Sequence, residues 1–386
     1  MSRPSTPRVA LLVDTSTTWG RRLIEGVLAR TRRHRPWQVW LRPHGQEELI
    51  HPPPGWAGEG VIARVSSLAL ARQLTGLGVP VVNVSAIELP GVTFPRVTTD
   101  QRLAARLAVQ HFLDRGFRHF GYCGLPRLAY VSRHCKAFVE SLEGHGYRCS
   151  AYLKGPGKKA GSGDRADQED LGQWLRRLPR PVGVLTWTLR SLDVLDACHE
   201  AGLHVPEDVA ILSGAEDELL CEASSPPLSG VAGHAERIGH EAAALLDRLM
   251  QGGRPPRQPV LLPPTHVVCR QSTDTLAIDD ADLVAAIRFI RAQASRPIQV
   301  KDVLRAVPVS RRALERRFRD TLGRTPACEI RHVHLERARQ LLAETDMPIP
   351  EVAAASGFGS GEYLAVAFKA QTGLSPLRYR TQARVR

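Results

Sequence analysis

An internal repeat near the C-terminus constrains the fold of this chain more than any other feature. Five residues recur 50 positions further along: Ser310, Leu314, Phe318, Gly323 and Pro326 return as Ser360, Leu364, Phe368, Gly373 and Pro376. In each copy the Ser can cap a helix, apolar residues follow at helical spacing, and the Gly and Pro can end the helix. A short helical segment precedes each copy. The pattern therefore predicts two helix-turn-helix units that read neighbouring segments of the DNA major groove.

The charge of the chain supports an interaction with nucleic acid. The 386 residues carry a net charge of +13, and residues 279–386 contain 19 Lys and Arg against 12 Asp and Glu. Arginines crowd the helix of the first copy at Arg311, Arg312, Arg316, Arg317 and Arg319. Such a run is usually only a solvated helix face, and helical hairpins are common in any α-helical domain. In the second helix of a helix-turn-helix, however, arginines suit phosphate and guanine contacts.

The two predicted reading helices differ in their polar side chains. In the first, we expect Ser310 to cap the helix and three arginines to face the major groove: Arg311, Arg312 and Arg316. The second helix offers as polar groups Ser360, Glu362, Tyr363 and Lys369, and carries the apolar Ala365, Val366 and Ala367. We therefore expect the second helix to position phosphates and to read DNA shape, with few base contacts.

The first 270 residues follow a different pattern, in which short apolar runs alternate with amphipathic stretches. The predicted strands are residues 9–13, 39–41, 61–63, 79–84, 119–123, 182–186, 209–212 and 260–262. The predicted helices are residues 21–33, 68–77, 103–115, 135–145, 171–178, 191–201 and 236–250. This alternation predicts an α/β fold with parallel sheets in two lobes. Ligands in such folds bind beyond the carboxyl ends of the strands.

Other functional classes leave no signal. The seven cysteines form no CxxC pair and no Cys/His cluster has zinc spacing, so neither a metal nor a cofactor is expected. Residues 154–168, rich in Gly and Lys, lack the order of a phosphate-binding loop and are expected to form a mobile surface loop. Without a GxSxG or HExxH motif we assign no catalytic residues and expect no enzyme. The apolar runs are too short for a signal peptide or a membrane span, which predicts a cytoplasmic protein.

The chain resembles two known families, one at each end. Its last hundred residues resemble the DNA-binding domain of AraC/XylS-family transcription regulators through the words VKDVL, SRRALERRF, LGRTP, LERARQLL, IPEVAAASGF and GLSPLRYR. The part before them resembles the effector domain of LacI/GalR-type regulators, whose fold is shared with periplasmic sugar-binding proteins. The words here are VALLVDTS, WGRRLIEGV, VPVVNVS, GFRHFGYCG and GLHVPEDVAIL. As a whole, the chain resembles the D-xylose-responsive activators, which join these two parts.

The resemblance implies an effector site, but several of its polar residues have changed. Ala215 stands where sugar-binding relatives place an Asp, and His134 stands where many place an Arg. Trp187 and Thr188 replace an Asn-Asp pair; Trp187 can stack on a ligand ring or simply pack in the lobe. Because a lost hydrogen bond to a charged group weakens binding, we expect D-xylose to bind poorly and an apolar-faced or acidic ligand, or none, to be preferred. The candidate effector-binding residues are Trp19, Arg21, His134, Trp187, Glu216 and Asp217.

These patterns predict a sensor and dimerisation domain at residues 8–272 and a DNA-binding domain at 280–386, joined by the polar segment 270–282. The resemblance implies a homodimeric transcription regulator. Its partners would be double-stranded operator DNA, RNA polymerase if it activates, and a small effector such as a sugar or sugar acid. Lobe closure would set whether two DNA-binding domains reach both half-sites. Two alternatives stay open: a sensor that has lost ligand binding and serves only for dimerisation, and a soluble solute-binding protein.

Overall fold

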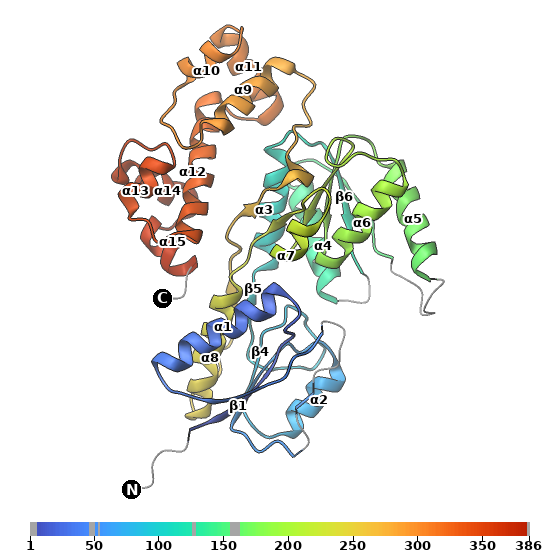
Figure 1. Ribbon diagram of the computed structural model, residues 1–386, viewed down its shortest axis with the longest axis vertical. Helices are drawn as coiled ribbons and strands as arrows, with labels where there is room; N and C mark the ends of the chain where they lie inside the picture. Colours follow the sequence, from blue (N-terminus) through green and yellow to red (C-terminus); the bar gives the residue numbers. More distant parts are fainter. Residues whose placement is uncertain (1–5, 46–50, 53–54, 126–128, 155–162, 384–386) are drawn as a thin grey trace.

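The computed structural model describes residues 6–45, 51–52, 55–125, 129–154 and 163–383. Figure 1 shows two α/β lobes, one above the other, and a helical domain that lies beside the upper lobe. The N-terminal part of the chain forms the lower lobe, and the C-terminal part forms the helical domain. Within the described residues, no helix combines the length and the apolar character that crossing a membrane requires.

The first lobe is built on a parallel sheet of four strands in the order β2-β1-β3-β4. Its elements are β1 (Arg8–Leu12), α1 (Thr18–Arg33), β2 (Gln38–Leu41), β3 (Gly60–Ala63), α2 (Leu68–Gly76), β4 (Val81–Asn83) and α8 (Ala235–Met250). Strand β1 is buried on both faces: Val9 and Leu11 pack with α1 and α8, whereas Ala10 and Leu12 pack with α2. A strand covered by helices on both faces has a continuous apolar sequence. This is why β1 could be predicted from the sequence.

Helices α1 and α8 cross at two glycines. A Cβ on Gly26 would lie 1.7 Å from the backbone oxygen of Glu236, and a Cβ on Gly239 would lie 1.9 Å from the backbone oxygen of Leu23. Any larger residue at either position would push the helices apart. The crossing therefore fixes α1 against the sheet and holds its N-terminus at the boundary between the lobes.

The second lobe is built on six strands in the order β12-β10-β9-β8-β6-β7, parallel except for β12. Its strands are β6 (His119–Cys123), β7 (Cys149–Tyr152), β8 (Val182–Thr186), β9 (Val209–Ser213), β10 (Ser229–Val231) and β12 (Val267–Val268). Its helices are α3 (Gln101–Leu113), α4 (Ala129–Glu143), α5 (Gly163–Arg177), α6 (Thr188–Glu200) and α7 (Glu218–Ala223). Helices α3 and α4 cover one face of the sheet, and α5 and α6 cover the other. The predicted parallel sheets in two lobes are thus confirmed.

Strands β5 (Val97–Thr99) and β11 (Val260–Leu262) pair in parallel beside the boundary between the lobes. Several of the elements that the sequence patterns missed, β5, β7, β10, β12 and α7, have two to six residues. Such segments are too short to establish a periodicity.

The loop predicted over residues 154–168 is wrong in its second half, because α5 begins at Gly163. Residues 155–162 lie outside the described part of the chain. Asp167 anchors the start of α5: its carboxylate accepts a hydrogen bond from Arg190 at 2.8 Å and another from the Tyr152 hydroxyl at 2.8 Å. A buried ion pair thus holds a segment whose composition resembles that of a loop.

The helical domain contains α9 (Ala281–Ala292), α10 (Val300–Ala306), α11 (Arg311–Leu322), α12 (Pro326–Glu344), α13 (Ile349–Ala355), α14 (Gly361–Thr372) and α15 (Pro376–Ala383). Helices α10 and α11 form the first helix-turn-helix unit, α13 and α14 form the second, and α12 joins them (Figure 1). Each unit has its own core, one around Leu314 and Phe318 and the other around Leu364 and Phe368. The residues that repeat in the sequence therefore occupy equivalent positions in the two cores.

The helix ends of the repeat follow the sequence signals. Ser310 accepts a hydrogen bond from the backbone N–H of Ala313 at 3.3 Å, and Ser360 accepts one from Tyr363 at 3.2 Å. Gly323 and Gly373 end the two helices in the left-handed conformation, at φ 67° and 75°. These are the conformations that favour glycine after a helix. The predicted caps are confirmed.

Candidate functional sites: an interlobe pocket and two DNA-reading helices

A pocket lies between the two lobes, at the carboxyl ends of strands from both sheets, and holds a cavity of about 150 Å³. The first lobe contributes the start of α1 and the residues after β1, β3 and β4. The second lobe contributes the residues after β8 and β9 and the start of α3. Open α/β sheets bind ligands at this end of their strands, so the pocket has the expected place.

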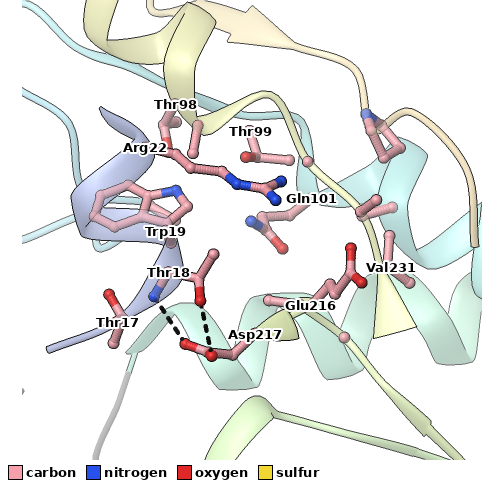
Figure 2. Close-up of a pocket in the computed structure, with 18 of the residues that line it drawn as sticks. Thr17, Thr18, Trp19, Arg22, Thr98, Thr99, Gln101, Glu216, Asp217 and Val231 are labelled. Atoms are coloured by element: carbon pink, nitrogen blue, oxygen red, sulfur yellow. Dashed lines mark hydrogen bonds between the residues drawn. The ribbon is translucent and has the colours of Figure 1, made fainter. Parts of the chain in front are cut away.

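A carboxylate from the second lobe holds the N-terminus of α1 across the pocket. Asp217 accepts hydrogen bonds from the backbone N–H and the hydroxyl of Thr18, both at 3.0 Å (Figure 2). The unsatisfied N–H groups and the dipole of a helix N-terminus favour a negative charge there. An ion pair between the lobes also joins Arg22 and Glu218, at 2.5 Å. These contacts link the lobes directly, one helical turn apart on α1.

One buried side-chain acceptor in the pocket, on Gln101, has no partner among the described residues. The Oε1 atom of Gln101 is buried and accepts no hydrogen bond within the described residues. Figure 2 shows that the side chains of Gln101 and Arg22 both point into the pocket. By contrast, Asp14 is satisfied by the Thr17 hydroxyl at 2.5 Å and by Arg64 at 3.3 Å. A buried acceptor without a partner costs free energy, so Gln101 is poised for a donor from a bound molecule.

Two aromatic side chains add flat apolar surfaces to the pocket. Trp19 lies on α1 with the guanidinium carbon of Arg64 at 5.9 Å from its ring centroid, and Trp187 lines the other lobe. The ring of His134 packs edge-on to Trp187, with their centroids 5.3 Å apart. His134 also contacts the Tyr122 hydroxyl at 3.0 Å. Burial lowers the pKa of His134 to about 4, so this ring is neutral at pH 7 and supports Trp187 from behind.

Four of the six candidate effector residues line the pocket: Trp19, Trp187, Glu216 and Asp217. Two do not. His134 is fully buried behind Trp187. The guanidinium of Arg21 turns away and donates to the backbone oxygens of Thr15 and Ser16, at 2.9 and 3.0 Å.

The pocket is lined not by Arg21 but by its neighbour Arg22, which lies one turn after Thr18 on α1. Glu216 is already paired with Arg270 at 2.8 Å. Gln101 and Arg64 were missed, because neither lies in a recognisable motif. Ala215 lines the pocket without any polar side-chain atom, and the side chain of Thr188 lies outside the described part of the chain.

On the first reading helix, three of the predicted DNA contacts are exposed: Arg311, Arg312 and Arg316. Arg311 also pairs with Glu315 along the helix at 3.0 Å. Arg317 has a different role, because it pairs with Asp280 and Asp282 at the start of α9, at 3.0 and 2.7 Å. On the second reading helix, Glu362, Tyr363 and Lys369 are exposed, and Ser360 is the N-cap.

The sensor contacts the helical domain through Asp114, which caps the C-terminus of α3. Its carboxylate binds Arg324, just before α12, at 2.6 Å and His332, in the first half of α12, at 2.7 Å. Burial favours the neutral carboxyl, but the hydrogen bond from His332 and the charges of His332 and Arg324 outweigh it and hold the pKa of Asp114 far below its usual range. Burial likewise opposes protonation of His332, yet Asp114 raises the pKa of this imidazole.

A second contact joins the other end of α12 and α15 to the sensor. The Tyr379 hydroxyl donates to the backbone oxygen of Thr265 at 3.0 Å, and Glu344 pairs with His266 at 3.3 Å. The polar segment over 270–282, expected to join the two domains, also packs against the second lobe. Ser272 and Thr273 are buried, and the Ser272 hydroxyl donates to the backbone oxygen of Ile211 at 2.6 Å. Their short side chains satisfy buried backbone groups, which anchors the connection to the second lobe.

A two-lobed sensor joined to tandem helix-turn-helix units defines a class of protein, the ligand-responsive transcription regulators. Two family models match the chain: a periplasmic binding protein-like domain over residues 109–273 and a helix-turn-helix domain over residues 303–382.

The chain is 30% identical over 381 residues to the xylose operon regulatory protein of Escherichia coli (strain K12), which covers 97% of this chain and 96% of that protein. It is 27% identical to the xylose operon regulatory protein of Haemophilus influenzae, covering 97% and 98%. It also matches the solved structure of the xylose-binding transcription activator XylR, with a TM-score of 0.63, 28% identity and 98% of each chain covered. The chain therefore belongs to the AraC family of DNA-binding transcription regulators, in the group that carries a periplasmic-binding-protein-like sensor.

Proposed function

We propose that this protein controls transcription in response to a small molecule that binds between the lobes of its sensor. The unpartnered Gln101 acceptor in the interlobe pocket is the observation that carries the proposal. A pocket that served only to pack the lobes together would pair this group or replace it by an apolar one. The regulator binds operator DNA in the cytoplasm as a homodimer and, where it activates, contacts RNA polymerase.

The pocket favours a single ring that has hydroxyl or carboxylate groups. A cavity of about 150 Å³ accommodates one six-membered ring. Trp19 and Trp187 offer apolar faces, and Gln101 accepts a hydrogen bond. Arg22 pairs with Glu218 through Nη2 and can bind an anionic group through its other N–H groups. The relatives include regulatory proteins of the xylose operon and a xylose-binding transcription activator, so a monosaccharide or a sugar acid is the class to test. Because Ala215 contributes no carboxylate, we expect D-xylose to bind more weakly than an acidic sugar that Arg22 can reach.

Helix α3 is the route by which we propose that the pocket acts on the DNA-binding domain. Its first residue, Gln101, lines the pocket, and its C-cap, Asp114, binds Arg324 and His332. The helix has 13 residues, which corresponds to a rigid rod of about 20 Å. A ligand that binds Gln101 and shifts it would therefore shift Asp114 at the other end of α3 as well. A second wall of the pocket, at Pro264, adjoins the contact between Thr265 and Tyr379.

A sensor without a ligand is the second candidate function, and one observation favours it. Asp217 and Thr18 already join the lobes, as do Arg22 and Glu218. Lobe closure then needs no effector, and the sensor would serve as a dimerisation body. The two proposals differ in what Gln101 does, because only a ligand-binding pocket depends on its acceptor.

The experiment is a thermal-shift screen of the full-length protein against monosaccharides and sugar acids, followed by calorimetric titration. A ligand at 100 times its Kd raises stability by about 2.7 kcal/mol. Gln101→Leu should remove most of that shift, whereas Arg102→Ala, an exposed neighbour in the same turn, should preserve it. Stabilisation by no compound would support the sensor without a ligand. Equal stabilisation of both variants would show that a ligand binds without using the Gln101 acceptor. A dissociation constant for D-xylose below the millimolar range would contradict the expectation that this sugar binds weakly.

A further inference from the structure

The outward faces of the two reading helices differ at their centres. At about 3.6 residues per turn, a residue two positions after a buried one points to the opposite side of a helix. In α11 the residue two positions after buried Leu314 is Arg316, and in α14 the residue two positions after buried Leu364 is Val366. Val366 is 70% exposed. The same place in the repeat therefore holds a guanidinium in one helix and a branched apolar side chain in the other.

Val366 makes no contribution to the core of its unit. Leu364 and Phe368 fill that role, and both are fully buried. A β-branched residue is also a poorer helix former than Ala or Leu, so an exposed valine here does not help the helix. A single exposed apolar residue is ordinary on a protein surface. Here, however, Tyr363 lies one turn before it, is 53% exposed, and has its ring held edge-on by Phe358, with the centroids 5.6 Å apart. The two side chains give the reading face of α14 an apolar centre.

In the DNA major groove, the C5-methyl group of thymine is the apolar feature of a base pair, and apolar side chains recognise it by contact. Arginine, by contrast, recognises the two acceptors of guanine. Lys369, one turn after Val366 and exposed, can bind a phosphate and hold the helix in the groove.

We propose that α14 recognises its DNA segment through a contact between Val366 and a thymine methyl group, with Tyr363 beside it. This inference rests on the DNA-binding function and specifies what the second helix reads. It sharpens the expectation of few base contacts: the second segment has a weak preference for thymine and no strong preference for guanine. Exclusion of water from one methyl group corresponds to about a fourfold change in affinity, or roughly 0.8 kcal/mol.

The test begins with selection of operator sequences from random double-stranded DNA by the full-length protein. Each thymine of the selected operator is then replaced by deoxyuridine, which lacks the C5-methyl group but keeps the base pair. Wild-type protein should lose about fourfold in affinity at one or two thymines, all in the segment next to the guanines that depend on α11. Val366→Ala should bind the thymine and deoxyuridine operators equally. Leu377→Ala, which removes a 63% exposed apolar side chain from α15, should still distinguish them.

The outcomes separate this inference from the function on which it rests. If no sequence is enriched, the DNA-binding function and the inference both fail. If an operator is enriched but deoxyuridine is tolerated at every position, the inference alone fails. Discrimination by Val366→Ala as strong as that of the wild type would also overturn it. Because Val366 is exposed, its replacement leaves the core intact, and thermal unfolding of the variant should match that of the wild type.

Discussion

The two helix-turn-helix units have nearly the same interior and different reading surfaces. Leu314 and Leu364 are fully buried, as are Phe318 and Phe368, and both reading helices begin at a Ser cap and end at a left-handed Gly. On the outside the two helices differ. The repeat places Gly361, Glu362 and Val366 of the second unit where the first unit has Arg311, Arg312 and Arg316. Packing therefore constrains one side of each helix and leaves the other free to specialise. The first reading helix carries the arginines, and the second carries an apolar centre with one acidic residue, Glu362, and one basic residue, Lys369.

The largest effect should come from removing the arginines of the first unit. The triple change Arg311→Ala, Arg312→Ala and Arg316→Ala should lower operator affinity by at least 100-fold, since each base contact is worth about 1–3 kcal/mol. The dependence of affinity on salt should also become shallower, because fewer counterions are released. Fluorescence anisotropy at several salt concentrations measures both quantities.

Arg106→Ala is the matched control, because this exposed arginine lies on α3 of the sensor, away from the reading helices. It should leave affinity and its salt dependence unchanged. If the triple variant binds its operator as tightly as the control at the same salt concentration, the assignment of the first reading helix is wrong.

The interiors of the two units should respond alike to the same change. Leu314→Ala and Leu364→Ala each remove a fully buried side chain, so each should lower the free energy of unfolding by about 2–5 kcal/mol. Chemical denaturation with circular dichroism measures the loss. A large effect in one unit and less than about 0.5 kcal/mol in the other would show that the two cores are not equivalent.

Two of the contacts between sensor and DNA-binding domain should differ in strength. Asp114→Asn removes the charge that Arg324 and His332 share, whereas Tyr379→Phe removes one neutral hydrogen bond. We expect Asp114→Asn to loosen the first unit by roughly 1.5–3 kcal/mol and to weaken the effect of an effector on DNA affinity, with Tyr379→Phe costing about 1 kcal/mol. Hydrogen exchange of α12 and α15 with and without the sensor ligand distinguishes these effects. Equal protection losses in the two variants would contradict the comparison.

The charged contact should also depend on pH. The pKa of His332 is raised, so its contribution is complete below the ordinary histidine value of about 6.5 and is lost as pH rises through the raised value. The pKa of Asp114 is lowered, so its contribution is complete above the ordinary aspartate value of about 3.9 and is lost only in stronger acid. Stability of the first unit, followed by thermal unfolding, should therefore decline from pH 6.5 towards pH 9. In His332→Gln that decline should be absent; a decline of the same size would mean that another group titrates.

The smallest effect concerns the acidic residue of the second unit. Glu362 occupies the place that Arg312 has in the first unit, and it is exposed. Glu362→Gln removes a charge that DNA phosphates repel, so affinity should rise by less than about tenfold. Arg312→Gln should change affinity in the opposite direction. A loss of affinity in Glu362→Gln would instead place this carboxylate against a base amino group, a contact that acidic side chains make with cytosine.

Much of this fold could be predicted from the sequence, because local signals determine it. The repeat revealed both helix-turn-helix units with their caps, and strands such as β6 and β8 were predicted to the residue. Strand β10 was missed because its residues, Ser-Gly-Val, form no apolar run. The start of α5 was mistaken for a loop, since only a distant partner, Arg190, reveals the role of Asp167.

The pocket and the interdomain contact were harder to predict. The sequence segment WGRRLIEGV places Arg21 and Arg22 near the pocket, but it does not show which of these adjacent arginines lines it. Gln101 belongs to no recognisable sequence motif. Only the structure distinguishes it, because its Oε1 atom is buried without a hydrogen-bond partner among the described residues. Asp114 and Arg324 are 210 positions apart, and no local pattern joins them. Sequence patterns describe what one segment prefers, whereas these sites arise where segments meet.

The measurement that tests this account most directly is a base-by-base affinity scan of the selected operator with the full-length protein. The account predicts one segment with strong preferences, about 1–3 kcal/mol per base, that vanish in the arginine variant of α11. About one helical turn of DNA away, roughly 34 Å, it predicts a second segment with weak preferences for thymine that vanish in Val366→Ala. Two segments of equal strength, or a second segment that depends on guanine, would contradict the claim that the two units read DNA by different means.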